Sequence, residues 1–272
     1  MKKRLKLLPK IFFIFFSVLL IAFGVLSIVP IKTTMVNHRG YSKKAPENTL
    51  SAYKLSYEKG YKYVECDVDF TLDGVPVLLH DGIIDRTSNA TGNINIRDIT
   101  YAQALEYDFG YEDKFGNNYK GEKIPTFYEF ISLCETYSLS PYIELKGGTH
   151  RFTDEQIKLL INTVKSSSIK EYTFISFSYS LLEKVKNYDD TARLGYVINK
   201  IENNDLEKAI KLKTNNNSVF INANFGYLTP KKIKSVRNAG LGLEVWTVNF
   251  RAVCVILSPF VDKITTDKVI YK

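Results

Sequence analysis

Tyr63-Val64-Glu65-Cys66-Asp67-Val68 is a strand-like stretch whose odd and even positions carry different chemistry. Successive side chains of a strand point to opposite faces, so Glu65 and Asp67 share one face. Cys66 and Val68 then share the other. In a closed barrel the two carboxylates would line the interior, and Cys66 would pack under the surrounding helices. Two carboxylates on one inward face repel each other unless a cation or a proton lies between them.

From about Thr34 onward, short strand-like runs alternate with helix-like segments. Eight strands that alternate with helices are typical of a parallel (β/α)8 TIM barrel rather than an open sheet. A chain of 272 residues that is 45% hydrophobic can bury such a core, so we predict one barrel domain over residues 34–272. The predicted strands are Met35–Asn37, Tyr63–Val68, Tyr142–Leu145, Thr173–Phe177, Leu194–Ile198, Val219–Asn222, Leu243–Val248 and Asp262–Thr265. The predicted helices are Leu50–Lys59, Phe127–Thr136, Asp154–Ser167, Tyr179–Asn187, Asn204–Lys213, Pro230–Ala239 and Arg251–Leu257.

A β-hairpin is predicted directly after the quoted strand. Asp73 and Gly74 are a strong two-residue turn signal between two apolar runs. With those two residues as the loop, Asp67 lies directly opposite His80, and opposed residues have Cβ atoms ~5 Å apart. Pro76 indicates an edge arm that projects from the barrel mouth. The hairpin would therefore return His80 to the level of the carboxylates. The alternative is a plain hairpin with an exposed histidine.

The N-terminal segment predicts one transmembrane helix. Five cations make residues 1–10 basic, and Ile11–Val29 contains no charged residue. As a helix this run spans ~28 Å, about the thickness of the hydrocarbon core of a bilayer. The cations should stay in the cytoplasm, which gives a single-pass protein of the cell membrane with its barrel domain outside. A cleaved signal peptide, which would give a secreted protein, is the alternative.

The charge distribution argues against nucleic-acid binding. Five of the 37 basic residues lie within residues 1–10, and the remainder carries 32 basic against 29 acidic residues. No basic stripe is left for the barrel domain. Cys66, Cys134 and Cys254 are scattered and form no CxxC pair, so neither a disulfide framework nor a zinc site is predicted. The oligomeric state is not predicted.

Short polar strings lie at or just after the predicted C-terminal ends of strands, where such barrels carry their chemistry. Together they supply two imidazoles for proton transfer, three carboxylates for a metal and two cations for an anionic group. This inventory matches phosphate-ester chemistry assisted by a divalent ion. The alternative is that the acids pair with Arg39 and Lys146 without a metal. The strings are His38-Arg39-Gly40, Pro46-Glu47-Asn48-Thr49, Glu65-Cys66-Asp67, His80-Asp81 and Glu144-Leu145-Lys146.

In their order and spacing these strings resemble those of the glycerophosphodiester phosphodiesterases, from about Val36 to Asp267. The resemblance implies a TIM barrel that uses a metal to hydrolyse glycerophosphodiesters to sn-glycerol 3-phosphate and an alcohol. Any one string is weak evidence, but the ordered set is specific. Further matching strings are Asp85-Arg86-Thr87, Lys123-Ile124-Pro125-Thr126, Ile175-Ser176-Phe177, Val245-Trp246-Thr247-Val248-Asn249 and Thr265-Thr266-Asp267.

The resemblance also implies roles for individual residues. The metal ligands of the family map onto Glu65, Asp67 and Glu144, which would hold one divalent metal. Three hard oxygen donors suit Mg²⁺ or Ca²⁺ better than zinc. The two proton carriers of the family map onto His38 and His80. We assign His38 as the base and His80 as the acid, although the two roles could be exchanged.

Contacts with the substrate are implied in the same way. Arg39 and Lys146 match the residues that contact the phosphate, and Trp246 matches the residue that borders the pocket. Family members insert a small subdomain after the second histidine, and residues 82–123 fit it. The chain departs from the family at Lys263, where glycine is usual before the last strand.

Several functions and local roles stay open at this level. The substrate could be a lysophospholipid or a polymeric glycerol phosphate, and sphingomyelinase-D-like phosphotransfer is a related alternative. A catalytically silent binding module is a third possibility, which would show a lost histidine or metal ligand, and none is lost. Asn48 and Thr49 are predicted to cap the helix that begins near Leu50.

Overall fold

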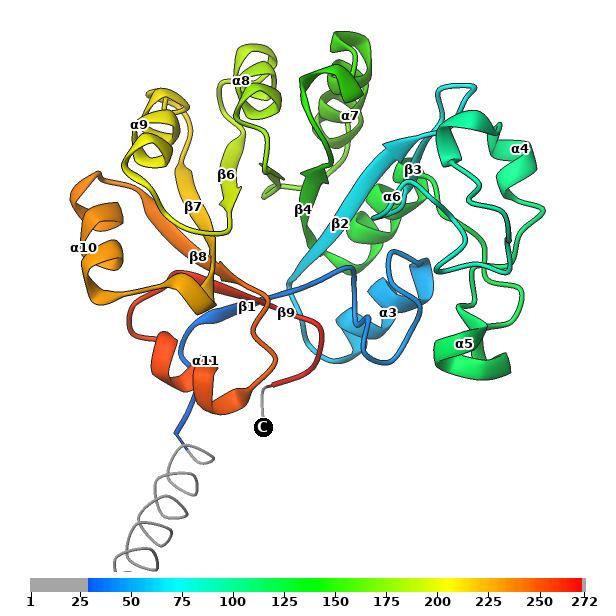
Figure 1. Cartoon of the computed structure of the whole chain (residues 1–272), viewed down its shortest axis with the longest axis horizontal. Coiled ribbons are helices and arrows are strands. Elements are labelled where there is room, and N and C mark those ends of the chain that lie inside the picture. Colours follow the sequence, from blue (N-terminus) through cyan, green and yellow to red (C-terminus); the bar gives the residue numbers. More distant parts are fainter. Residues whose placement is uncertain (1–28, 271–272) are drawn as a thin grey trace, which may run out of the picture.

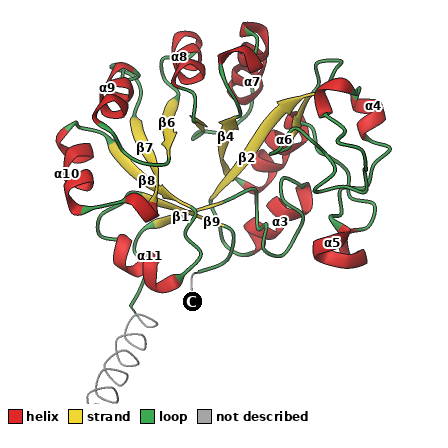
Figure 2. Ribbon diagram, in the orientation of Figure 1, coloured by secondary structure: helices red, strands yellow, loops and turns green. Residues whose placement is uncertain are grey.

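The computed structural model describes residues 29–270, and within them eight parallel strands form a closed barrel (Figures 1 and 2). β1 pairs in parallel with both β2 and β9, which closes the ring. The predicted TIM barrel is therefore confirmed. The barrel strands are β1 (Thr34–Asn37), β2 (Tyr63–Phe70), β4 (Ser140–Leu145), β5 (Thr173–Ser176), β6 (Arg193–Ile198), β7 (Val219–Asn224), β8 (Gly242–Trp246) and β9 (Lys263–Thr266).

Helices surround the barrel, and each of the seven predicted ones is present (Figure 1). Threonine side chains begin several of them: Thr126 and Thr153 each form a reciprocal capping box with the residue three positions later. The helices are α3 (Leu50–Glu58), α6 (Phe127–Tyr137), α7 (Asp154–Lys165), α8 (Tyr179–Tyr188), α9 (Asn203–Lys211), α10 (Pro230–Asn238) and α11 (Arg251–Leu257).

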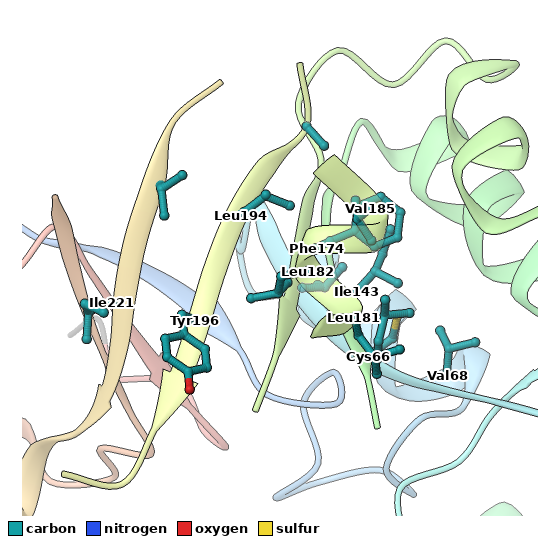
Figure 3. Packing of buried hydrophobic residues seen from close by; sticks show 14 of the residues in the cluster. Cys66, Val68, Ile143, Phe174, Leu181, Leu182, Val185, Leu194, Tyr196 and Ile221 are labelled. Atoms are coloured by element: carbon teal, nitrogen blue, oxygen red, sulfur yellow. The ribbon is translucent and has the colours of Figure 1, made fainter. Parts of the chain in front are cut away.

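The strand alternation predicted for β2 decides what faces the core. Cys66 and Val68 are buried in the apolar layer between the barrel and its helices, together with residues such as Leu181 of α8 (Figure 3). Glu65 lines a cavity at the barrel mouth instead. The two-residue period of a strand is therefore enough to separate the chemistry from the packing.

A charged cluster fills the opposite, N-terminal end of the barrel. Glu244 is fully buried, and its Oε1 accepts hydrogen bonds from Arg193 Nη2 at 2.6 Å and from Tyr142 Oη at 3.1 Å. Lys263 Nζ lies 3.4 Å from the same oxygen. The lysine that departs from the family pattern therefore helps to compensate a buried carboxylate, which would be costly if it were unpaired.

The register predicted for the hairpin is wrong by one residue. β3 (Pro76–Leu78) pairs with β2 so that Val68 faces Leu78, and the amide of Leu79 donates to the carbonyl of Asp67 at 3.0 Å. The loop has three residues rather than two, with Gly74 at φ +79°, a left-handed conformation that glycine adopts without strain. β3 does form the predicted edge arm, since it ends the strand order. His80 follows two residues beyond this arm.

Residues 82–123 form an insertion with an apolar cluster of its own (Figure 1). Ile84, Ile96 and Phe109 of the insertion pack with Val77 and Leu79 of the hairpin arm. The arm and the residues that lead from it to His80 are therefore braced from outside the barrel. The short elements here are η1 (Ile96–Asp98), α4 (Tyr101–Ala104), α5 (Glu112–Phe115) and η2 (Gly116–Tyr119).

Over residues 29–270, no helix has the length and apolar character needed to cross a membrane. Residues 11–28 of the predicted anchor lie outside the described part of the chain.

Candidate active site

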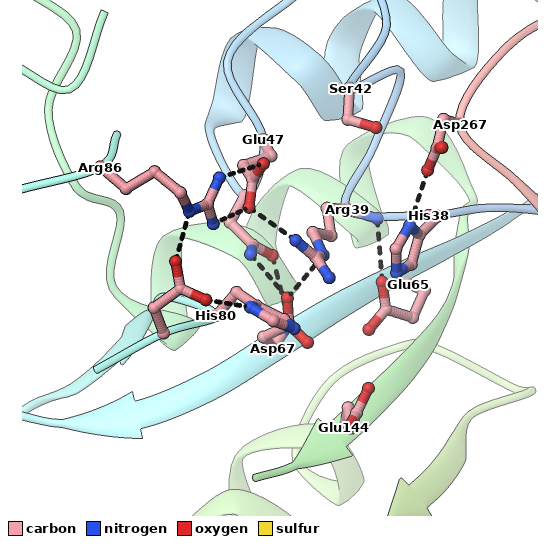
Figure 4. Close-up of polar contacts among 12 residues, drawn as sticks. His38, Arg39, Ser42, Glu47, Glu65, Asp67, His80, Arg86, Glu144 and Asp267 are labelled. Atoms are coloured by element: carbon pink, nitrogen blue, oxygen red, sulfur yellow. Dashed lines mark hydrogen bonds and ion pairs between the residues drawn. The ribbon is translucent and has the colours of Figure 1, made fainter. Parts of the chain in front are cut away.

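The polar strings of the sequence converge at the C-terminal end of the barrel, around a cavity of about 260 Å³. One side of the cavity is polar, and the other side is formed by Ile175, Phe177, Val197 and Trp246. The polar side is shown in Figure 4. Of the predicted site residues, the cavity is lined by His38, Arg39, Glu65, His80, Glu144, Lys146 and Trp246.

Three carboxylates meet in this site, because β2 and β4 are adjacent and in register. Asp67 is the direct neighbour of Glu144 across the strand pair, and Glu65 lies two residues earlier on β2. One oxygen from each of the three lies within 4.8 Å of the others, and all three residues are buried. Glu65 Oε1 has no hydrogen-bond partner among the described residues. This donor set fits a hard divalent cation such as Mg²⁺ or Ca²⁺.

Two cations partly compensate the three carboxylates. Lys146 Nζ lies 2.9 Å from Asp67 Oδ1 and 2.8 Å from Glu144 Oε1, and Arg39 Nε lies 3.1 Å from Asp67 Oδ2. Burial raises the pKa of Glu65 well above its usual value, and the charges of Asp67 and Glu144 raise it further. Burial acts on Asp67 too, but Lys146 and Arg39 outweigh it and lower its pKa. The cluster therefore has more carboxylates than cations. A bound metal cation would compensate the remaining negative charge.

Lys146 and Arg39 were predicted to contact phosphate, and both lie at the cavity in contact with carboxylates. Arg39 Nη1 donates to Glu47 Oε1 at 2.8 Å, and the Arg39 backbone amide donates to Glu65 Oε2 at 2.9 Å. Arg39 adopts φ +55°, and Gly40 follows at φ +74°. A Cβ on Gly40 would lie 2.7 Å from the Cβ of Ala52, so the tight turn after His38 requires glycine.

His38 is oriented by residues from the far end of the chain. Its Nδ1 lies 2.6 Å from Asp267 Oδ1, and because a carboxylate only accepts, Nδ1 carries the proton. Asn249 braces Asp267 twice, since its Nδ2 donates to Oδ2 at 2.5 Å and its Oδ1 accepts from the Asp267 amide at 2.9 Å. This arrangement leaves Nε2 of His38 as the basic nitrogen.

His80 is oriented by residues near to it in sequence and in the insertion. Its Nδ1 pairs with Asp81 Oδ1, and Arg86 Nε pairs with the other oxygen of Asp81. The Arg86 guanidinium also donates to both carboxylate oxygens of Glu47, at 2.7 and 3.0 Å. Burial lowers the pKa of His80, partly offset by the charge of Asp67. Figure 4 shows His38 and His80 on either side of Arg39 and Asp67.

The prediction for Asn48 is wrong, while that for Thr49 is confirmed. Thr49 is the N-cap of α3 and accepts from the amide of Ala52 at 3.3 Å. Asn48 adopts φ +59°, donates from Nδ2 to Asp67 Oδ2 at 2.8 Å and accepts the Asp67 amide at Oδ1. The oxygen of Asn48 also accepts the hydroxyl of Tyr53 at 2.9 Å. Asn48 therefore fixes a predicted metal ligand rather than a helix end.

Residues without a predicted role therefore support the site. Asp267 and Asn249 hold His38, Asp81 and Arg86 hold His80, and Glu47 joins Arg39 to Arg86. All of them lie in strings that match the family pattern. This match is the feature of the sequence that could have pointed to them. The roles of Asp267, Asn249 and Glu47 could not be read from the sequence because they depend on contacts between different loops.

The apolar side of the cavity is an aromatic wall. Trp246 Nε1 donates to the carbonyl of Asn222 at 3.1 Å, and Phe177 meets the indole edge-on with ring centroids 5.6 Å apart. Phe177 is 45% exposed, so this wall continues to the molecular surface. Asn222 Oδ1 is buried without a hydrogen-bond partner in the described chain and lines the same cavity. The cavity thus offers a polar acceptor and an apolar face opposite the charged residues.

The fold and the site together define a (β/α)8-barrel enzyme equipped for acid–base chemistry beside a cluster of metal-binding type. The sequence pattern of the Glycerophosphoryl diester phosphodiesterase family matches residues 38–270. The chain belongs to this family.

Individual relatives agree with this assignment. A glycerophosphodiester phosphodiesterase of Caldanaerobacter subterraneus subsp. tengcongensis is 32% identical over 221 residues, which cover 80% of this chain and 86% of that protein. Glycerophosphodiester phosphodiesterase 1 of Homo sapiens is 36% identical over 128 residues, 47% of this chain and 38% of the human protein. A phosphodiesterase structure from Oleispira antarctica, in complex with the product sn-glycerol-3-phosphate, has a TM-score of 0.77 and 27% identity. The match covers 86% of this chain and 92% of that one.

Proposed function

We propose that this protein hydrolyses glycerophosphodiesters to sn-glycerol 3-phosphate and an alcohol in the cavity at the C-terminal end of the barrel. One observation carries the proposal. Two histidines, each held by a carboxylate, lie on either side of the acidic cluster. The relative from Oleispira antarctica, which binds sn-glycerol-3-phosphate, supports the same substrate class.

Glu65, Asp67 and Glu144 would hold one divalent cation, Mg²⁺ or Ca²⁺. Such an ion supplies charge stabilisation for the phosphoryl oxygens as negative charge develops on them. Lys146 and Arg39 lie beside the same carboxylates, so a cation bound there would leave their positive charges available to the phosphate. They would add charge-assisted hydrogen bonds to the phosphoryl group.

The two imidazoles divide the proton transfers between them. His38 has its Nδ1 proton held by Asp267, so Nε2 can accept the proton of the attacking group, either water or a neighbouring hydroxyl of the glycerol. His80, on the opposite side, would protonate the departing alcohol oxygen. Histidine suits both steps because an imidazole has two ring nitrogens that can accept and donate protons in the physiological pH range.

The decisive test is hydrolysis of glycerophosphocholine by the full chain. The quantity measured is the glycerol 3-phosphate that is released. We expect turnover to stop with EDTA and to return with Mg²⁺ or Ca²⁺, and the comparison would show which ion supports the reaction better. Glu65→Gln should lose both turnover and the metal-dependent rise in Tm, because ligand binding stabilises the folded state. Glu171→Gln is the control, since this exposed carboxylate pairs with Lys62 away from the cavity.

Other outcomes would assign a different function. Metal binding without turnover of any diester would favour a catalytically silent binding module. Hydrolysis of lysophosphatidylcholine but not of glycerophosphocholine would favour a lysophospholipase D. Product retained as a cyclic phosphate would favour sphingomyelinase-D-like phosphotransfer. Hydrolysis of a polymeric glycerol phosphate in preference to glycerophosphocholine would favour a polymer-degrading enzyme.

We also propose that residues 11–29 anchor the protein in the cell membrane, with residues 1–10 in the cytoplasm and the barrel outside. The support is the uncharged apolar run that follows a basic N-terminus. Membrane fractionation and protease protection of spheroplasts test this arrangement. Recovery of a shortened, soluble protein from the medium would favour a cleaved signal peptide instead.

A further inference from the structure

The segment that contains α11 (Arg251–Leu257) differs from the neighbouring helix α10 in charge. Residues 252–261 contain no charged residue, whereas α10 alone carries four cations. Ile256 is 56% exposed and Phe260 is 50% exposed, and Phe250, just before the helix, is 69% exposed. A surface helix of a globular protein normally turns charged residues outward, so the uncharged, apolar surface of α11 is typical of an interaction site.

The described chain begins against this same helix (Figure 1). Arg251 Nη2 donates to the carbonyl of Val29 at 2.9 Å. Thr33 donates from Oγ1 to the carbonyl of Ser258 at 2.6 Å, and its amide donates to the Ser258 hydroxyl at 3.0 Å. Residues 29–33 are therefore tied to α11 near both of its ends. The uncharged run of the N-terminal segment ends at Val29, so a bilayer that contained this run would have its surface beside α11.

We propose that the exposed apolar face formed by Phe250, Ile256 and Phe260 lies in the interfacial region of the lipid bilayer. This inference rests on the proposed anchoring of residues 11–29. Exposed aromatic and aliphatic side chains on a surface helix and at its two ends are what such interfaces accept. Lys268 Nζ lies 5.7 Å from the centre of the Phe250 ring, and a cation at this position suits an anionic lipid surface.

The proposed membrane contact affects where the cavity meets its substrate. Phe250 follows Asn249, which holds Asp267, the partner of His38. The apolar face therefore begins at the rim of the catalytic cavity and runs along the side of the barrel. A barrel seated on this face brings the cavity mouth next to the membrane surface, where a diester that keeps an acyl chain, such as a lysophospholipid, would be held.

Fluorescence quenching by brominated lipids tests the contact. The full-length Ile256→Cys variant, labelled with NBD, is reconstituted into vesicles of phosphatidylcholine and phosphatidylglycerol, with or without brominated phosphatidylcholine. Labelling is selective because the three native cysteines are buried, and burial raises the pKa of the Cys254 thiol to about 11. Ile210→Cys on α9, where the isoleucine is 45% exposed, is the matched control.

We expect the probe at position 256 to lose at least half of its fluorescence, while the probe at position 210 stays unchanged. Phe260→Cys provides a second site on the same face and should behave like Ile256→Cys. Each variant is first checked for wild-type hydrolysis of water-soluble glycerophosphocholine, which shows that it is folded. Equal quenching at positions 256 and 210, in protein that floats with the vesicles, would overturn the proposal while leaving the anchor intact. Protein that does not float would overturn both.

Discussion

The two histidines of the cavity are held by networks of very different reach. His38 pairs with Asp267, 229 residues away along the chain, whereas His80 pairs with Asp81, the next residue. The partner of His38 is braced by Asn249, from the loop after β8, so this network exists only when the barrel has closed. The partner of His80 is braced by Arg86, from the insertion.

This contrast separates a network that barrel closure assembles from one that the hairpin and the insertion assemble. The His38 network joins loops after β1, β8 and β9, all rooted in the closed sheet. The His80 network lies just beyond the edge arm β3, and its Arg86 side chain is 40% exposed. We therefore expect substitutions around His38 to affect every substrate, and those around His80 to depend on the leaving group.

The largest effect is expected for His38→Gln. Loss of the base should lower kcat by ~10²–10⁴-fold on every diester, whatever its leaving group. Turnover of glycerophosphocholine and of the p-nitrophenyl diester of glycerol 3-phosphate would be measured side by side. Thermal unfolding is the control for folding. Near-normal rates on either substrate would contradict the assignment of His38 as the base.

His80→Gln should separate the two substrates. We expect a loss of ~10²–10⁴-fold on glycerophosphocholine, whose alkoxide leaving group needs a proton. On the p-nitrophenyl diester the loss should be only ~10-fold, because p-nitrophenolate leaves without protonation. If His38→Gln shows this selectivity and His80→Gln does not, the two roles are exchanged.

Asp267→Asn tests the long-range network and should have an intermediate effect. The amide keeps the shape of the carboxylate but no longer fixes the Nδ1 proton of His38, so kcat should fall by roughly 10²-fold. The loss should be equal on both substrates, and Tm should change little. An effect on KM alone would show that Asp267 does not act through His38.

Asp81→Asn is the matched change in the local network, and we expect the smallest effect. Asp81 is 33% exposed, so solvent can partly replace its contact with His80, and kcat should fall by only about 10-fold. The loss should be confined to glycerophosphocholine. A loss as large as that of Asp267→Asn would mean that both histidines depend equally on their acidic partners.

Sequence reasoning predicted the barrel and the inward face of β2 because both follow from short-range periodicity. It missed the hairpin register, since a three-residue loop with Gly74 in the left-handed region replaced the expected two-residue turn. His80 nonetheless reaches the cavity, because β3 ends at Leu78 and the chain turns inward beyond the ladder. The role of Asn48 was missed for a related reason: its backbone turns left-handed at φ +59°, which aims the side chain at Asp67.

The sequence by itself determined the fold class, the residue types of the site and their order, because strand periodicity and motif strings are local properties. Only the tertiary structure decided that Asp267 orients His38, and that Lys146 lies between Asp67 and Glu144. Those pairings depend on the register of β2 against β4 and on the closure of β1 against β9. Both bring together residues far apart in the chain, through packing that no local pattern encodes.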